Sequence, residues 1–217
     1  KYEVHILNLR NHISTNWAES MAWQHLTEDL KSYLDNEPLK GGFILMGHSM
    51  GGKMAMHFAS VYPDLVEKLI VVDMAPKEYP LRYKVEFEAL MELNLESLRS
   101  RKEASELLIK KIPSDDFRES LLTNLERTSD GYQWRTNLRG LYDGLNTIRE
   151  NPLSDNFLFN KETLFIKGQN SDFIADSDVL KIKKYFPRMH FVELAGVGHN
   201  PHAENKEALL QSLYDWL

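Results

Sequence analysis

Residues 43–58 read FILMGHSMGGKMAMHF and contain two overlapping motifs that predict different chemistries. Residues 47–51 form a G-x-S-x-G, the sharp strand-to-helix turn that exposes a nucleophilic serine. Residues 47–53 also match G-x-x-x-x-G-K, the beginning of a loop that cradles phosphate groups. The first motif predicts acyl transfer through Ser49, and the second predicts nucleotide binding through Lys53. Residues elsewhere in the chain therefore have to decide between them.

The phosphate-loop interpretation lacks one chemical component. Such a loop needs Ser or Thr after its lysine, because that hydroxyl binds the magnesium ion. Here Met54 follows Lys53, and a thioether is a poor ligand for a hard cation. The stretch LIVVD at 69–73 resembles the strand and Asp that hold the metal in nucleotide-binding proteins. Nucleotide binding through residues 47–53 therefore stays as the weakest alternative, and Lys53 is otherwise expected to be a solvated residue on a helix.

The segments around Ser49 have the pattern that a nucleophile turn requires. Residues 43–46 form a short apolar run, typical of a strand buried on both faces, and residues 50–61 predict a helix. Residues 68–72 (KLIVV) predict a second buried strand. Strands and helices that alternate in this way indicate a parallel α/β sheet. The same patterns predict further strands at 3–9, 163–166 and 189–194, and further helices at 18–34, 179–185 and 204–217.

Residues 79–150 interrupt this alternation. They show no convincing strand pattern, and breaks at Pro113-Ser114 and at 129–131 separate stretches that look helical. We therefore predict one α/β domain over residues 1–217 with a helical lid at 79–150, in which Trp134 belongs to the lid core. The helices of this insertion are predicted at 81–98, 100–112, 115–127 and 132–149.

A nucleophilic serine needs a histidine base, and the histidine needs a carboxylate to orient it. His199 lies in GVGHNPH, after the last predicted strand and before the last helix, where a loop can bring an imidazole to the serine. Two carboxylates compete for the third role. Asp73 directly follows the strand next to the nucleophile, and functional groups gather at the carboxyl ends of parallel strands. In many enzymes with this type of fold, the acid is the last residue of a G-x-x-D stretch. Here Ser171 occupies that position and Asp172 lies one residue beyond it. We therefore prefer Asp73 and keep Asp172 as the fallback.

The other histidines predict no site of their own. His48 is expected to pack at the turn next to the serine. His199 and His202 have the spacing of a metal pair, but no carboxylate or third histidine lies at ligand spacing, and we expect no metal. The remaining histidines are expected to be structural or at the surface: His5, His12, His25, His57 and His190.

Composition excludes several classes of protein. The 217 residues suffice for one sizeable core, and the net charge of -6 argues against a dedicated nucleic-acid binder. The chain has no cysteine, which excludes disulfides and a cysteine nucleophile. No apolar run has the length of a membrane span. The chain begins with Lys1 and shows no targeting segment, so we expect a processed chain or a fragment of a longer one.

The quoted motifs together resemble one branch of the α/β-hydrolase superfamily. The stretches that carry the resemblance are LMGHSMGGKMAM, VVDMAP, WRTNLRGL, FIKGQNSDFI and GHNPHAENKEALLQSL, which are spread over nearly the whole chain. The branch contains the mitochondrial abhydrolase-domain proteins, small bacterial esterases and the yeast ethanol acetyltransferases. The resemblance implies that the acid comes from the strand after the nucleophile, which agrees with Asp73.

The resemblance implies acyl transfer through an acyl-Ser49 intermediate, without a cofactor. His199 would act as base and then as acid, and the Met50 backbone N–H would donate to the oxyanion. The implied substrates are small carboxylic esters or acyl thioesters, with acetyl-CoA and an alcohol such as ethanol as the pair for acyl transfer. A mitochondrial location is implied by the resemblance alone, and no protein partner is predicted.

Two departures from the family pattern bear on activity. Ile13 stands where relatives usually have glycine in the sequence RNHG-x-S. The family also has strands earlier in the sequence and an H-G motif that supplies a second oxyanion donor. In the usual spatial order of the sheet, one of those earlier strands lies between the predicted strands at 3–9 and 43–46. We therefore keep a second hypothesis, a catalytically impaired fragment or interaction protein of the same fold.

Overall fold

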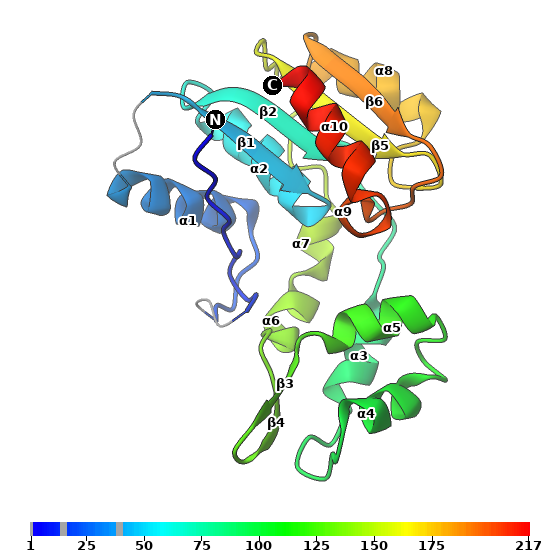
Figure 1. The fold of residues 1–217 in the computed structure, drawn as a ribbon. Helices are drawn as coiled ribbons and strands as arrows, with labels where there is room; N and C mark the ends of the chain where they lie inside the picture. The colour runs from blue at the N-terminus through cyan, green and yellow to red at the C-terminus, as the bar shows by residue number, and fades with distance from the viewer. Residues whose placement is uncertain (1, 14–16, 38–40) are drawn as a thin grey trace. The chain divides into compact units, whose positions relative to one another are not determined.

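The computed structural model describes residues 2–13, 17–37 and 41–217 (Figure 1). The chain divides into two compact units, one of residues 1–29 and 79–149 and the other of residues 30–78 and 150–217. Helix α1 (Trp23–Asn36) begins in the first unit and ends in the second. It corresponds to the predicted helix at 18–34 but begins at Trp23, so residues 18–22 lie outside it.

The second unit, of residues 30–78 and 150–217, contains a four-stranded sheet in which every neighbouring pair is parallel. Every residue of its strand β5 is buried, as expected for a continuous apolar run in a parallel sheet. The predicted α/β-hydrolase fold, with its mostly parallel sheet flanked by helices, is confirmed. In spatial order the strands are β1 (Phe43–His48), β2 (Val66–Val72), β5 (Thr163–Gly168) and β6 (Met189–Leu194).

Helices cover both faces of this sheet. Figure 1 shows α10 on one face and α2 and α8 on the other. Leu209 of α10 belongs to the same buried cluster as Ile70 of β2 and Leu164 of β5, so the helix is held by apolar packing. The bounds of the helices in this unit are α2 (Met50–Val61), α8 (Asp176–Tyr185), α9 (Pro201–Glu204) and α10 (Lys206–Trp216).

The strand predicted at 3–9 is absent from the structure. Residues 2–9 have no regular secondary structure and are largely exposed, with Ile6 at 89%. An alternating apolar pattern forms a strand only where a neighbouring strand accepts its backbone hydrogen bonds. Among the described residues, strand β1 pairs with β2 alone, and four of its residues are half-buried while Met46 is 45% exposed. The prediction that β1 is buried on both faces is therefore also wrong.

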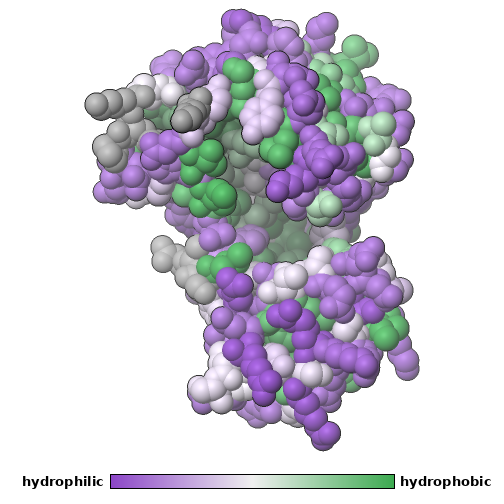
Figure 2. Space-filling view, viewed as in Figure 1, coloured by the Kyte–Doolittle hydropathy of each residue, from purple (hydrophilic) through white to green (hydrophobic). Residues whose placement is uncertain are grey.

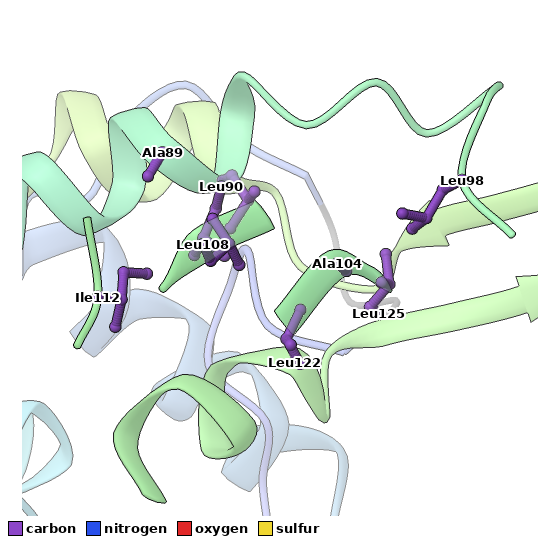
Figure 3. Close-up of a cluster of buried hydrophobic side chains, with 9 residues drawn as sticks. Ala89, Leu90, Leu98, Ala104, Leu108, Ile112, Leu122 and Leu125 are labelled. Carbon is purple, nitrogen blue, oxygen red and sulfur yellow. The ribbon is translucent and has the colours of Figure 1, made fainter. Parts of the chain in front are cut away.

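Residues 79–149 fold mainly into short helices around a leucine-rich cluster (Figure 3). The cluster joins Leu90, Leu108, Leu122 and Leu125, each from a different element, and Trp134 packs against it as predicted. The helices are α3 (Lys84–Met91), α4 (Arg101–Leu108), α5 (Asp115–Leu122), α6 (Leu138–Asp143) and α7 (Leu145–Arg149).

The insertion also contains a β-hairpin, which corrects the prediction that it holds no strand. Strands β3 (Leu125–Thr128) and β4 (Gly131–Trp134) pair antiparallel. Gly131 has a φ of 130°, a backbone conformation that favours glycine. Residues 129–131, interpreted above as a break between helices, therefore form the tight turn at 129–130 and the first residue of β4.

The WRTNLRGL motif contacts the RNHI stretch at residues 10–13, in the unit of residues 1–29 and 79–149. The Asn137 side chain donates to Asn11 Oδ1 at 2.9 Å, and the Asn137 N–H donates to the Asn11 carbonyl at 3.0 Å. Asn11 is fully buried and has a φ of 67°, which asparagine tolerates better than most residues. These contacts give both asparagines a structural role.

The visible face of the molecule is mostly hydrophilic, with smaller apolar areas between the polar ones (Figure 2). Within the described ranges, the structure contains no helix with the length and apolarity needed to span a bilayer.

Candidate active site

Ser49 lies at the sharp turn between β1 and α2, as the G-x-S-x-G motif predicts. Its φ of 53° and ψ of -122° are rarely adopted by a residue with a side chain, and such strain is typical of a nucleophile turn. Gly47 makes the turn feasible, because a Cβ there would lie 2.1 Å from the Gly51 carbonyl oxygen. Gly52 lets the helix approach the sheet, since its Cβ would lie 3.1 Å from Val71.

Sheet register brings Asp73 next to Ser49. His48 and Val72 are Cα partners at the ends of β1 and β2, so the residues that follow them leave the sheet side by side. The Ser49 N–H donates to the Val72 carbonyl at 3.1 Å. Asp73 is fully buried and has a φ of 50°.

His199 connects these two residues. Its Nε2 lies 2.9 Å from Ser49 Oγ, and its Nδ1 lies 2.7 Å from Asp73 Oδ2. A carboxylate only accepts hydrogen bonds, so Nδ1 carries the proton and Nε2 is left to accept from the serine hydroxyl. In this tautomer the imidazole can take the Ser49 proton, and the buried carboxylate can stabilise the imidazolium that results.

The structure brings Asp73, and not Asp172, to the histidine. The Gly168 N–H donates to Asp73 Oδ1 at 3.0 Å, and the Ser171 hydroxyl donates to Oδ2. Asp172 is exposed, and its neighbour Ser171 is the residue that contacts Asp73.

Two aromatic rings pack on His199. Phe173 stacks on the imidazole with 3.6 Å between ring centroids and 12° between the planes. The ring of His48 lies 4.9 Å from that of His199, centroid to centroid, with 42° between the planes. Burial lowers the pKa of His48 to about 4, so this second imidazole is neutral near pH 7. His48 therefore packs at the turn as predicted. It also makes a hydrogen bond to the His199 carbonyl, which the sequence did not suggest.

Lys53 is not the solvated residue that the sequence predicted. Its side chain is 1% exposed, and its Nζ donates to the Glu150 carbonyl at 2.6 Å. Met50 is the first residue of α2, where a backbone N–H has no partner within the helix and is available to an anion. No group of His, Asp or Glu side chains among residues 2–13, 17–37 and 41–217 has the arrangement of a metal site.

Residues 1–211 match the model of the alpha/beta hydrolase family. The chain belongs to this family. A solved structure described as a marine microorganism esterase is 32% identical, with a TM-score of 0.91 over 97% of this chain and 83% of that one. The family match and this structure support a hydrolase of the esterase or lipase type.

Three curated relatives lie in the branch that the sequence motifs suggested. A putative esterase/lipase of Haemophilus influenzae is 32% identical over all of this chain and 74% of its own length. The sn-1-specific diacylglycerol lipase ABHD11 of Danio rerio is 30% identical over 97% of this chain and 68% of its own. A probable alcohol acetyltransferase of Saccharomyces cerevisiae is 30% identical over 99% of this chain and 68% of its own. The resemblance stated from the sequence is thus confirmed at the level of the family and its branch.

Proposed function

We propose that this chain is a serine esterase that cleaves small carboxylic esters or acyl thioesters through an acyl-Ser49 intermediate. The observation that carries the proposal is the position of His199, whose two ring nitrogens contact Ser49 Oγ and Asp73 Oδ2 at 2.9 and 2.7 Å. A serine, an imidazole and a buried carboxylate in this order form the arrangement that activates a hydroxyl for attack on a carbonyl.

In the proposed reaction, His199 Nε2 takes the Ser49 proton while Oγ attacks the carbonyl carbon of the substrate. The negative charge that forms on the carbonyl oxygen is stabilised by the Met50 N–H at the start of α2. His199 then gives its proton to the leaving alcohol or thiol, and the acyl group stays on Ser49. In the second half, His199 takes a proton from water, the hydroxide oxygen attacks the acyl carbon, and Ser49 recovers its proton as the acid leaves.

Reaction with a fluorophosphonate probe tests the nucleophile, because the probe phosphonylates an activated serine. We expect labelling of the unmodified chain and none of Ser49→Ala. Release of nitrophenol from short-chain nitrophenyl esters should be lost in the same variant. Absence of both labelling and ester cleavage in the folded chain would favour the alternative of an impaired fragment or interaction protein.

Alcohol acyl transfer is the second candidate, and the similarity to the probable alcohol acetyltransferase of S. cerevisiae favours it. Here the acyl-Ser49 intermediate would be attacked by an alcohol in place of water. Incubation with acetyl-CoA, with and without ethanol, separates the two outcomes. Ethyl acetate as the main product would support transfer, whereas acetate alone in both incubations would support hydrolysis.

Nucleotide binding through residues 47–53 has little geometric support. The Lys53 ammonium is buried against the Glu150 carbonyl. The loop also bends around a serine whose hydroxyl contacts His199. Mitochondrial residence remains part of the proposal on resemblance alone, and fluorescence localisation of the protein in its own cells tests it.

A further inference from the structure

Residues 195–200 carry His199 on a loop that lies outside helices and strands. Its imidazole must meet Ser49 on one side and Asp73 on the other within a few tenths of an ångström. The loop has no strand ladder or helix to fix it, so hydrogen bonds to its backbone add to the contacts of the ring with Asp73 and Phe173 in setting the position of the imidazole.

The first of these contacts comes from His48. Its Nε2 lies 2.6 Å from the His199 carbonyl oxygen, and a carbonyl only accepts, so Nε2 is the donor. His48 is the last residue of β1 and directly precedes Ser49. The bond therefore connects the backbone of the base to the strand that carries the nucleophile.

The electrostatic setting of His48 fits this contact. Burial lowers its pKa to about 4, while the hydrogen bond to the His199 carbonyl acts in the opposite direction; the nearby imidazoles of His199 and His202 lower the pKa further, and Asp73 raises it. A neutral His48 keeps its Nε2–H as a donor and places no positive charge next to the imidazolium that forms on His199.

The second set of contacts comes from Glu204, the last residue of α9. Its Oε2 accepts from the Gly198 N–H at 2.5 Å, and its Oε1 accepts from the Asn200 N–H at 2.9 Å. Hydrogen bonds to a carboxylate are stronger than those between neutral groups. One side chain thus holds the backbone on both sides of His199, while His48 holds the carbonyl between them.

We propose that His48 and Glu204 are positioning residues, which together fix the backbone of residues 198–200 so that the His199 ring spans Ser49 and Asp73. The proposal rests on the proposed function for its catalytic consequence, though not for its structural one. A displacement of about 1 Å in a reacting group lowers a rate by roughly 100-fold. Loosening the loop should therefore reduce kcat while leaving substrate binding nearly unchanged.

The test compares variants that differ in hydrogen bonding and little in size. His48→Gln keeps an amide N–H near the position of Nε2, whereas His48→Met has similar length and no donor. We expect kcat for nitrophenyl acetate to fall by roughly 10- to 100-fold in His48→Met, with KM within about 2-fold. His48→Gln should stay within about 5-fold of the unmodified chain. Equal losses in the two variants, or no loss in His48→Met, would overturn the role of His48.

Glu204 is tested in the same way. Glu204→Gln retains one acceptor oxygen, and Glu204→Met retains none. The loss in kcat should therefore be larger in Glu204→Met than in Glu204→Gln. Identical kcat values in Glu204→Met and the unmodified chain would overturn the role of Glu204.

Hydrogen–deuterium exchange makes the test independent of activity. The peptide covering residues 195–204 should exchange at least about 10-fold faster in Glu204→Met and in His48→Met than in the matched Gln variants. Unchanged exchange in both Met variants would overturn the positioning proposal. If the unmodified chain cleaves no ester while exchange still responds, the proposed function fails and the positioning contacts stand.

Discussion

Asp73→Asn is the substitution that tests the architecture of this site most directly. It replaces one carboxylate oxygen with an amide nitrogen at nearly constant volume in a fully buried side chain. The remaining oxygen can still accept from the Gly168 N–H, which lies 3.0 Å from Oδ1. The new NH2 then faces His199 Nδ1, 2.7 Å from the position of Oδ2.

This exchange inverts the tautomer of the base. An amide NH2 is a donor, so Nδ1 must become an acceptor and the imidazole proton moves to Nε2. Nε2 then faces Ser49 as a donor and can no longer take its proton. The same change at the acid of a serine protease triad lowers kcat about 10⁴-fold. We expect a loss of about 10³- to 10⁴-fold here, or about 4–5.5 kcal/mol of transition-state stabilisation.

The measurement is kcat for short-chain nitrophenyl esters, with the rate of fluorophosphonate labelling as a second readout. Asp172→Asn is the matched control, since it makes the same chemical change at an exposed residue in the next candidate position. We expect its kcat within about 3-fold of the unmodified chain. A large loss in Asp172→Asn with nearly full activity in Asp73→Asn would refute the assignment of the acid.

Further predictions concern the turn, the pH dependence and the insertion. Gly47→Ala should abolish fluorophosphonate labelling, because the new Cβ would lie 2.1 Å from a backbone oxygen. The Cβ of Gly51→Ala would meet nothing within 4 Å, so this helical substitution should raise the free energy of unfolding by about 0.5–1 kcal/mol in urea titrations. His48 has a folded-state pKa of about 4 against 6.5 unfolded, so stability present above pH 6.5 should be lost as the pH falls toward 4. Between these pH values the free energy of unfolding should fall by about 3 kcal/mol more than in His48→Gln. Leu122→Ala should cost about 2–5 kcal/mol in the same titrations, since Leu122 is fully buried in the cluster of Figure 3.

The elements that the sequence predicted best are those whose pattern is set by local burial. The helix at 50–61 and the strand at 189–194 have the predicted bounds, because apolar periodicity and a nearby Pro or Gly define both ends. The prediction of a strand at 3–9 was wrong for a non-local reason, since its backbone needs a partner strand that no local pattern reveals. The hairpin at 125–134 was not predicted, because its short strands lie among helices and its turn resembles a break between helices.

The residues of the candidate site also divide into those that the sequence predicts and those that it does not. Ser49 and His199 follow from motifs, and Asp73 follows from the rule that neighbouring parallel strands end at one edge. By contrast, Glu204 acts through the backbone of a loop, and Phe173 acts by stacking on a ring. Neither contact has a sequence signature, because each depends on how loops fold back over the sheet.

The contact of Ser171 with Asp73 shows why a carboxylate at position 73 disfavours a second carboxylate at position 171. Its hydroxyl contacts the same Asp73 oxygen that accepts from His199, so residues 73 and 171 meet around a single acceptor position. Two carboxylates at hydrogen-bond distance in a buried site could not both stay ionised, because like charges raise the pKa of one of them. A hydroxyl at 171 avoids this repulsion and donates to the carboxylate that remains. The G-x-x-D position, interpreted from the sequence as a missing acid, is therefore the place from which this chain supports the acid supplied by the neighbouring strand.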